Sequence, residues 1–285
     1  MKQTIAFPDG REVLNLGQGT YRMGEEFKKK QQEIEALRTG IENGLTLIDT
    51  AEMYSEGRSE EIVGEAIQPY KRDDLFIVSK VLPMNAGEQH IHQSIDGTLK
   101  RLGVDELDLY LLHWRGHIPL QETVDVMEEL KWRGKIKGWG VSNFDLEDIQ
   151  ELLSLRNGLN CQTNQLLYHL ASRGIEFVLT DYLKESRIPI MAYCPIIGQE
   201  PDKKEMVHQS PTINRMARKY NLSVVQLLLA FVTQQENMIA IPKAASRDHV
   251  LQNADVLQVE LDDEDILILN EAFPVPDKRV PLKTK

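Results

Sequence analysis

Short apolar runs alternate with amphipathic stretches along the whole chain. The short runs are rich in β-branched and large apolar residues, and we predict eight strands at residues 15–20, 45–49, 75–80, 107–113, 136–142, 161–165, 188–193 and 238–242. Between them, apolar residues recur every three or four positions, which is typical of helices with one buried face. Three such faces are formed by Phe27, Ile34, Leu37 and Ile41, by Ile91, Ile95, Leu99 and Leu102, and by Ile175, Val178, Leu179 and Leu183.

The regular alternation of strands and helices favours a parallel α/β protein. Eight strand–helix units in about 250 residues match the size of a (β/α)8 TIM barrel. A doubly wound dinucleotide-binding domain would carry GxGxxG after its first strand, whereas residues 17–22 read GQGTYR and lack the third glycine. We therefore predict the α/β class, with one (β/α)8 barrel domain over residues 1–285.

Two short segments flank the predicted barrel. Residues 4–7 and 11–13 enclose the turn sequence Pro8-Asp9-Gly10, which predicts a β-hairpin that closes the bottom of the barrel. Residues 274–285 are rich in proline and lysine, and we expect them to form a loose C-terminal tail.

Composition and charge exclude several kinds of partner. Thirty-three basic and forty-four acidic side chains give a net charge of −11, which repels nucleic acids and anionic membranes. The apolar stretch at 224–232 is far shorter than the roughly 20 residues that cross a bilayer, and the N-terminus lacks the apolar core of a signal peptide. Cys161 and Cys194 form neither a disulfide framework nor a zinc motif. We expect a cytoplasmic protein and, because nothing in the pattern indicates a dimer face, a monomer or weak dimer.

Titratable residues follow three consecutive predicted strands. Asp49 ends the second strand, with Tyr54 just beyond it, while Lys80 and His113 end the third and fourth. Taken singly, each residue has a structural explanation. Asp49 could cap a turn and Tyr54 could be a half-buried aromatic. Lys80 could be a solvated strand end and His113 a core histidine with satisfied hydrogen bonds. The carboxyl ends of barrel strands meet at one rim, however, so we expect the four groups to share one site.

These four groups suit proton donation to a carbonyl oxygen. A tyrosine is protonated near neutrality, and a neighbouring ammonium would lower its pKa toward working pH. Asp49 would keep Lys80 charged, and His113 could hydrogen-bond the carbonyl oxygen and orient it. By contrast, His90 and His92 lie two residues apart on a predicted helix and point in different directions, so we predict no metal site.

The same residues resemble the catalytic motifs of the aldo-keto reductases, which are NAD(P)H-dependent carbonyl reductases on a (β/α)8 barrel. The resemblance implies that Asp49, Tyr54, Lys80 and His113 form the catalytic tetrad, with Tyr54 as the general acid. Residues 49–54, 112–114, 161–176 and 191–195 are most similar to a bacterial methylglyoxal reductase branch of that family.

Further motifs imply an NADPH site. GVSNF at 140–144, TNQ at 163–165, AYCP at 192–195 and IPK at 241–243 resemble the family's cofactor motifs. The resemblance implies that Ser142, Asn143 and Gln165 hold the nicotinamide carboxamide and that Tyr193 stacks on its ring. Lys243 would meet the 2′-phosphate, although Ala244 and His249 depart from the family pattern. The other implied cofactor residues are Gly19, Thr20, Cys194, Ser246, Arg247 and Asn253.

The predicted substrate pocket is shallow. Only residues 115–118 separate Trp114 from Pro119, and we expect Tyr21, Met23, Tyr54 and Trp114 to form the walls. Such a pocket favours small aldehydes and α-dicarbonyls. Two alternatives stay open: a Schiff-base aldolase with Lys80 as the nucleophile, and a non-catalytic NADPH-binding module.

Overall fold

The eight predicted strands form a closed parallel barrel in a computed structural model, which describes residues 3–198 and 200–284. Each strand pairs with the next along the chain, and parallel bridges from Leu16 to Ala240 and from Gly19 to Lys243 join the last strand to the first. The predicted (β/α)8 fold is thus confirmed. The strands are β3 (Gln18–Gly19), β4 (Leu47–Asp49), β5 (Phe76–Val81), β6 (Leu107–Leu112), β7 (Ile136–Ser142), β8 (Cys161–Leu167), β9 (Ile190–Tyr193) and β10 (Met238–Ala240).

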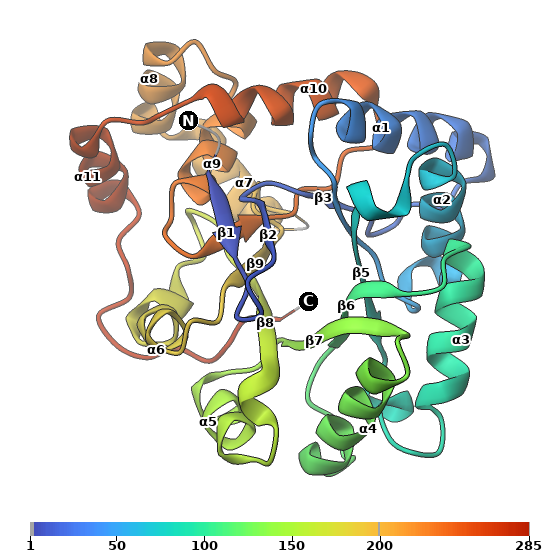
Figure 1. Cartoon of the computed structure of the whole chain (residues 1–285). Helices are drawn as coiled ribbons and strands as arrows, with labels where there is room; N and C mark the ends of the chain where they lie inside the picture. The colour runs from blue at the N-terminus through green and yellow to red at the C-terminus, as the bar shows by residue number, and fades with distance from the viewer. Residues whose placement is uncertain (1–2, 199, 285) are drawn as a thin grey trace.

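Helices surround the barrel (Figure 1). Asp145 and Ser223 each begin a helix with a capping box, and Gly44 follows the first helix at a φ of 90°. The helices are α1 (Lys30–Glu42), α2 (Arg58–Ile67), α3 (Ile91–Leu102), α4 (Leu120–Trp132), α5 (Leu146–Ser154), α6 (Leu179–Glu185), α7 (Pro201–Gln209), α8 (Pro211–Lys219), α9 (Val224–Thr233), α10 (Arg247–Asp255) and α11 (Asp263–Ala272). In the part of the chain that the structure describes, no helix is long and apolar enough to span a membrane.

Two of the predicted helical faces need correction. Phe27 is 88% exposed, because it lies in a 3₁₀ turn before α1 rather than on the buried face of that helix. The face from Ile175 to Leu183 is interrupted at Val178, which separates a 3₁₀ turn at Gly174–Phe177 from α6. In both cases a tighter turn changes the direction of the side chains relative to the helix that follows.

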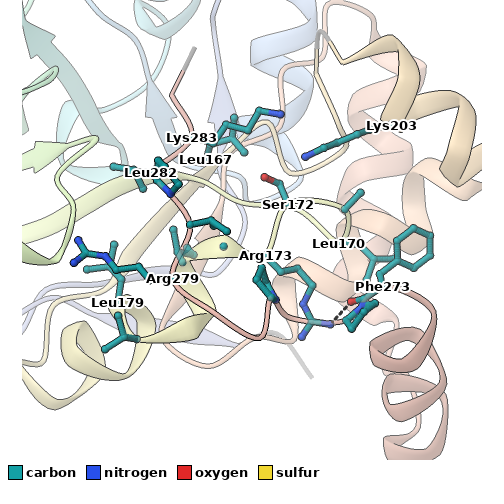
Figure 2. Close-up of a pocket in the computed structure, with 18 of the residues that line it drawn as sticks. Leu167, Leu170, Ser172, Arg173, Leu179, Lys203, Phe273, Arg279, Leu282 and Lys283 are labelled. Carbon is teal, nitrogen blue, oxygen red and sulfur yellow. Dashed lines mark hydrogen bonds between the residues drawn. The ribbon is translucent and has the colours of Figure 1, made fainter.

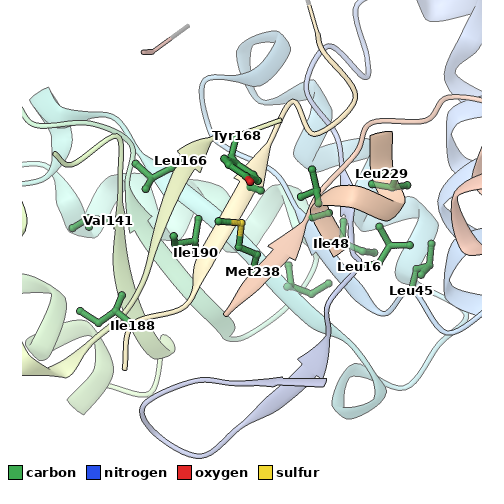
Figure 3. Close-up of a cluster of buried hydrophobic side chains, with 14 of the residues drawn as sticks. Leu16, Leu45, Ile48, Val141, Leu166, Tyr168, Ile188, Ile190, Leu229 and Met238 are labelled. Atoms are coloured by element: carbon green, nitrogen blue, oxygen red, sulfur yellow. The ribbon is translucent and has the colours of Figure 1, made fainter. Parts of the chain in front are cut away.

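Along the strands, side chains alternate between an inner hydrophobic layer inside the barrel and an outer hydrophobic layer between the barrel and the helices. In β6, Leu109 and Leu111 point into the barrel, whereas Tyr110 and Leu112 pack outward against helices. Figure 3 shows part of the outer layer, with Leu166 of β8, Ile190 of β9 and Met238 of β10, and with Leu229 of α9 near Leu16 and Leu45. This double burial explains why the strands read as nearly continuous apolar runs.

The N-terminal hairpin closes the bottom of the barrel, as predicted. Its strands are β1 (Thr4–Ala6) and β2 (Glu12–Leu14), and it crosses the barrel in front in Figure 1. Phe7 and Val13 join the inner hydrophobic layer, and the Phe7 ring stacks on Phe76 with centroids 5.1 Å apart. Arg11 donates a hydrogen bond to the Asp108 carbonyl over 2.9 Å. The opposite end of the barrel is therefore the end that can receive a ligand.

The C-terminal tail crosses this opposite end. Residues 274–284, for which we expected a loose conformation, form no helix or strand, but Arg279 pairs with Glu147 after β7 and Lys283 donates to Glu200 after β9 over 2.7 Å. A cavity of about 1140 Å³ lies between the tail and the loop after β8. Figure 2 shows Ser172, Lys203, Leu282 and Lys283 around it.

Candidate active site

The four predicted catalytic residues meet at the carboxyl ends of β4, β5 and β6. Lys80 Nζ lies 2.8 Å from Asp49 Oδ2 and 3.1 Å from the Tyr54 hydroxyl oxygen, and it also donates to the Thr50 carbonyl. The His113 ring meets the Tyr54 ring edge to face, with centroids 5.7 Å apart. Lys80 is fully buried and Asp49 is 2% exposed, so the ion pair is held away from water.

Burial controls the protonation of this cluster. It raises the pKa of Tyr54 well above its ordinary value, and the negative charge of Asp49 acts in the same direction. Our expectation that Lys80 brings the pKa of Tyr54 toward working pH therefore needs correction: Tyr54 remains a protonated phenol. Burial lowers the pKa of Lys80, while Asp49 opposes that effect. Burial, followed by the charge of Lys80, lowers the pKa of His113 to about 3, so its imidazole is neutral at physiological pH.

Amide and hydroxyl groups from β7, β8 and β9 lie beside this cluster. Asn143 has a left-handed backbone (φ 59°), and its Nδ2 donates to the His113 carbonyl and to Ser142 Oγ, both over 3.1 Å. The Tyr193 hydroxyl donates to Asn143 Oδ1 over 2.8 Å. Gln165 Nε2 donates to Asp49 Oδ1 over 2.8 Å. The structure thus brings the four residues Ser142, Asn143, Gln165 and Tyr193 to the same mouth of the barrel as Tyr54.

Lys243, with Lys29 and Arg22 nearby, forms a positively charged edge of the site beside the first barrel strand, β3. Gly19 bridges to Lys243, and a Cβ on Gly19 would lie 2.7 Å from the Ile241 carbonyl oxygen, so this close approach requires glycine. Loss of hydration, together with the positive charges of Lys29 and Arg22, lowers the pKa of Lys243, while the negative charge of Glu33 opposes this shift.

The helix α10 begins next to this edge. Ser246 is its N-cap and Arg247 its exposed first residue, while Asn253 is buried two turns further along. A helix N-terminus beside a lysine favours an anion such as a phosphate.

The remaining residues predicted for the cofactor site or the pocket walls each have contacts of their own. The Thr20 hydroxyl donates to the Asp49 carbonyl, and Cys194 follows Tyr193 with a φ of 55°. Tyr21 is 47% exposed and packs edge to face on Tyr54. Trp114 is half-buried, and its ring lies against that of His113 with centroids 4.9 Å apart. Met23, which we expected in the pocket wall, is fully buried in the outer hydrophobic layer, so we correct that assignment.

Sequence reasoning missed the contacts that join these residues. Gln165 and Asp49 are 116 residues apart, and the Ser59 hydroxyl supports the first loop by donating to the carbonyls of Thr20 and Met23. No local pattern marks such bonds, because they depend on closure of the barrel. Among the described residues there is no group of three His, Cys, Asp or Glu side chains that could hold a metal ion.

The residues present fit a nicotinamide cofactor. Ser142, Asn143 and Gln165 offer hydroxyl and amide groups, which can both donate to and accept from a carboxamide. The buried Nδ1 of His113 has no hydrogen-bond partner among the described residues, so it is free to bond to a ligand in the site. The Lys243 edge with the start of α10 supplies positive charge for a phosphate.

Comparisons with known proteins identify the family of this chain. The model of the Aldo/keto reductase family matches residues 15–273. The chain is 47% identical to methylglyoxal reductase YeaE of Escherichia coli, covering 99% of this chain and 98% of that protein, and 32% identical to glyoxal reductase of Bacillus subtilis, covering 93% and 91%.

A solved structure gives the same result in three dimensions. An aldo/keto reductase from Klebsiella pneumoniae, crystallised with NADP and acetate, superposes with a TM-score of 0.96 at 47% identity, over 100% of both chains. Because the family model, the relatives and the fold agree over nearly the whole chain, this protein belongs to the aldo/keto reductase family and is an oxidoreductase acting on carbonyl groups.

Proposed function

We propose that this protein uses NADPH to reduce small aldehydes and α-dicarbonyls, of the methylglyoxal type, to alcohols. The observation that carries the proposal is the Tyr54 hydroxyl, which lies 3.1 Å from the buried ammonium of Lys80 beside the amide groups of β7 and β8. The likeness to a methylglyoxal reductase and a glyoxal reductase supports the choice of substrate.

In this proposal residues at the mouth of the barrel would hold the cofactor. Ser142, Asn143 and Gln165 would bind the carboxamide, and Tyr193 would stack on the nicotinamide ring. Lys243, Ser246 and Arg247 bind the 2′-phosphate, which a structure crystallised with NADP at 47% identity supports. Gly19, Thr20, Cys194 and Asn253 complete the cofactor site. NADPH supplies the hydride that adds to the carbonyl carbon.

The proton comes from Tyr54. As the carbonyl carbon accepts the hydride, the phenol transfers its proton to the carbonyl oxygen, and the ammonium of Lys80 compensates the negative charge left on the phenolate. Asp49 balances Lys80, so the pair can stay buried without a net charge. The neutral imidazole of His113 can donate a hydrogen bond to the carbonyl oxygen without competing for the proton.

The short loop after β6 favours small substrates. Residues 115–118 join Trp114 to the start of α4. Of the predicted walls, Tyr21 packs against Tyr54 and Trp114 packs against His113. The Schiff-base alternative is disfavoured by the buried Lys80, whose ammonium already has three acceptors and would have to lose a proton to act as a nucleophile.

The test follows NADPH oxidation in the presence of methylglyoxal. We expect the wild-type protein to turn over repeatedly and the variant Tyr54→Phe to lose about 10²- to 10⁴-fold in kcat. The variant should still bind NADPH, as measured by tryptophan fluorescence. Tyr70→Phe, which removes a hydroxyl near Glu42 on the surface, is the matched control and should keep wild-type kcat.

Three results contradict the proposal. These are a wild-type protein that does not bind NADPH, one that binds it but transfers hydride only in a slow single turnover, and a Tyr54→Phe variant that keeps most of its kcat. The second result would favour the non-catalytic binding module.

A further inference from the structure

We infer that Gln165 is a positioning residue for the proton donor, in addition to its place in the cofactor site. Its side chain donates a hydrogen bond to Asp49 from the opposite side of the barrel. Asp49 in turn bonds to Lys80, and Lys80 bonds to Tyr54. Gln165 therefore links the cofactor site to the proton donor through a series of hydrogen bonds. This inference rests on the proposed function.

The Gln165–Asp49 bond joins two strands that are not neighbours in the barrel. Asp49 ends β4 and Gln165 lies in β8, four strands further round the sheet, so the bond crosses the barrel interior. Nε2 and Oδ1 are 2.8 Å apart, and the two residues are 1% and 2% exposed. The bond therefore lies in a protected interior, where losing a donor to a carboxylate is costly.

The two oxygens of Asp49 have different donors. Oδ2 accepts from Lys80 and Oδ1 accepts from Gln165. Thr20 cannot replace either donor, because its backbone N–H and its hydroxyl both bond to the Asp49 main-chain carbonyl. Thr20 thus fixes the backbone of Asp49, whereas Gln165 fixes the rotation of its carboxylate.

The rotation of this carboxylate affects Tyr54 through Lys80. Lys80 divides its ammonium between Asp49 Oδ2, the Thr50 carbonyl and the Tyr54 hydroxyl. Without Gln165, Oδ1 would be a buried charged atom with no donor, and the carboxylate would turn to bring both oxygens to Lys80. That movement would draw the ammonium away from Tyr54.

The same side chain retains groups that can face the cofactor. A primary amide has two N–H groups and one oxygen, and the bond to Asp49 uses only one N–H. The second N–H and Oε1 suit the oxygen and the amino group of a carboxamide. Ser142 Oγ donates to the Gln165 main-chain carbonyl over 3.0 Å and so holds the backbone at this point. Gln165 thus couples cofactor binding to the orientation of the acid.

The test compares Gln165→Met with Gln162→Met. Both replace a buried glutamine of β8 by methionine, but Gln162 lies at the hairpin end of the barrel, where its side chain bonds to the Asp9 N–H and the Asn160 carbonyl. We expect Gln162→Met to keep NADPH binding, and single-turnover hydride transfer at saturating NADPH, within about twofold of wild type. Gln165→Met should weaken binding and also slow hydride transfer by about 10- to 100-fold, with a larger solvent isotope effect.

A second variant adds a pH signature. In Gln165→Glu a carboxyl group faces Asp49, and its protonated form can donate to Oδ1 as the native amide does. Two adjacent carboxyls share a proton more readily as pH falls, so the hydride-transfer rate of Gln165→Glu should rise toward acid pH relative to wild type. Gln165→Met has no titratable group and should lack this rise.

A readout without turnover completes the test. The ring resonance of Tyr54, assigned by its loss in Tyr54→Phe, should shift in cofactor-free Gln165→Met but stay in place in Gln162→Met. The inference is overturned when the Gln165 variants change only the NADPH Kd and leave the hydride-transfer rate, its pH profile and the Tyr54 resonance as in wild type. Failure of the proposed function is a separate result, namely a wild-type protein that does not bind NADPH or does not reduce carbonyls.

Discussion

Two buried carboxylates at opposite ends of the barrel have very different surroundings. Asp108, near the start of β6, is 3% exposed and lies within 2.6 to 3.8 Å of three cations, Arg72, Lys137 and Arg11. Its Oδ2 also accepts from the Ile77 backbone N–H over 2.8 Å. Among the described residues, Asp49 at the end of β4 pairs with a single cation, Lys80, which is itself fully buried.

The difference separates the structural charge of Asp108 from the charges of Asp49 and Lys80 in the proposed active site. We therefore call the end of the barrel with Asp108 the structural end and the end with Asp49 the reactive end. The cations around Asp108 keep 22 to 32% of their side-chain surface exposed, so water shares the cost of their charge. Lys80 is shut away from water and divides its hydrogen bonds between Asp49 and Tyr54. One end of the barrel therefore uses charge to hold the hairpin, whereas in the proposed mechanism the other end keeps a charge that responds when Tyr54 gives up its proton.

The largest expected effect comes from exchanging each carboxylate for an amide. Asp49→Asn leaves Lys80 unpaired beside the acid, and we expect kcat for methylglyoxal to fall by about 10³-fold. Asp108→Asn should keep kcat within about twofold of wild type and lose about 1–3 kcal/mol of unfolding free energy instead. Steady-state kinetics and urea denaturation measure both. Equal losses of kcat in the two variants would remove the distinction between the two ends.

The next effect concerns the hairpin at the structural end. Phe7 is 3% exposed and stacks on Phe76, so Phe7→Ala should lower the free energy of unfolding by about 3 kcal/mol without changing kcat. Phe27→Ala is the matched control, because Phe27 is 88% exposed, and it should change stability by less than about 0.5 kcal/mol. Similar values for the two variants in urea titrations would show that the hairpin is not a stabilising plug.

A smaller effect comes from His113 at the reactive end. Its pKa is about 3 in the fold and about 6.5 in an unfolded chain, so below pH 6.5 the unfolded chain binds a proton that the fold excludes. Stability is therefore lost as pH falls, by about 2 kcal/mol from this group between pH 7 and pH 5.

The matching measurement is the free energy of unfolding at both pH values. His113→Asn should lose less stability than wild type on acidification, whereas His208→Asn at an exposed site should follow wild type. An identical pH dependence in all three proteins would mean that the neutral His113 is not responsible.

The smallest effect is expected for one of the cations at the structural end. Lys137→Met removes one partner of Asp108, but Arg72 and the Ile77 N–H remain. Because Lys137 is partly exposed, the loss of unfolding free energy should stay below about 1 kcal/mol and shrink further at high salt. A loss of several kcal/mol would show that Asp108 depends on all of its cations, as Asp49 depends on Lys80.

Much of the fold could be predicted from the sequence because its signals are local. The strands carry their apolar runs, and Asp145 and Ser223 mark helix starts through capping bonds within one turn. Phe27 shows the limit of this reasoning: its spacing matches the buried face of α1, but a 3₁₀ turn ahead of that helix leaves it exposed. Met23 shows the same limit in the site, where closeness in sequence to Tyr21 did not place it in the pocket.

The sequence by itself determined the order of strands and helices and placed Asp49, Lys80 and His113 at consecutive strand ends, because the period of apolar residues and the ends of apolar runs are properties of short segments. Only the tertiary structure decided that Gln165 reaches Asp49 across the barrel, that Tyr193 bonds to Asn143 and that burial raises the pKa of Tyr54. Those features arise from closure of the barrel, which removes water from groups far apart in the chain and makes each depend on the few partners left within reach.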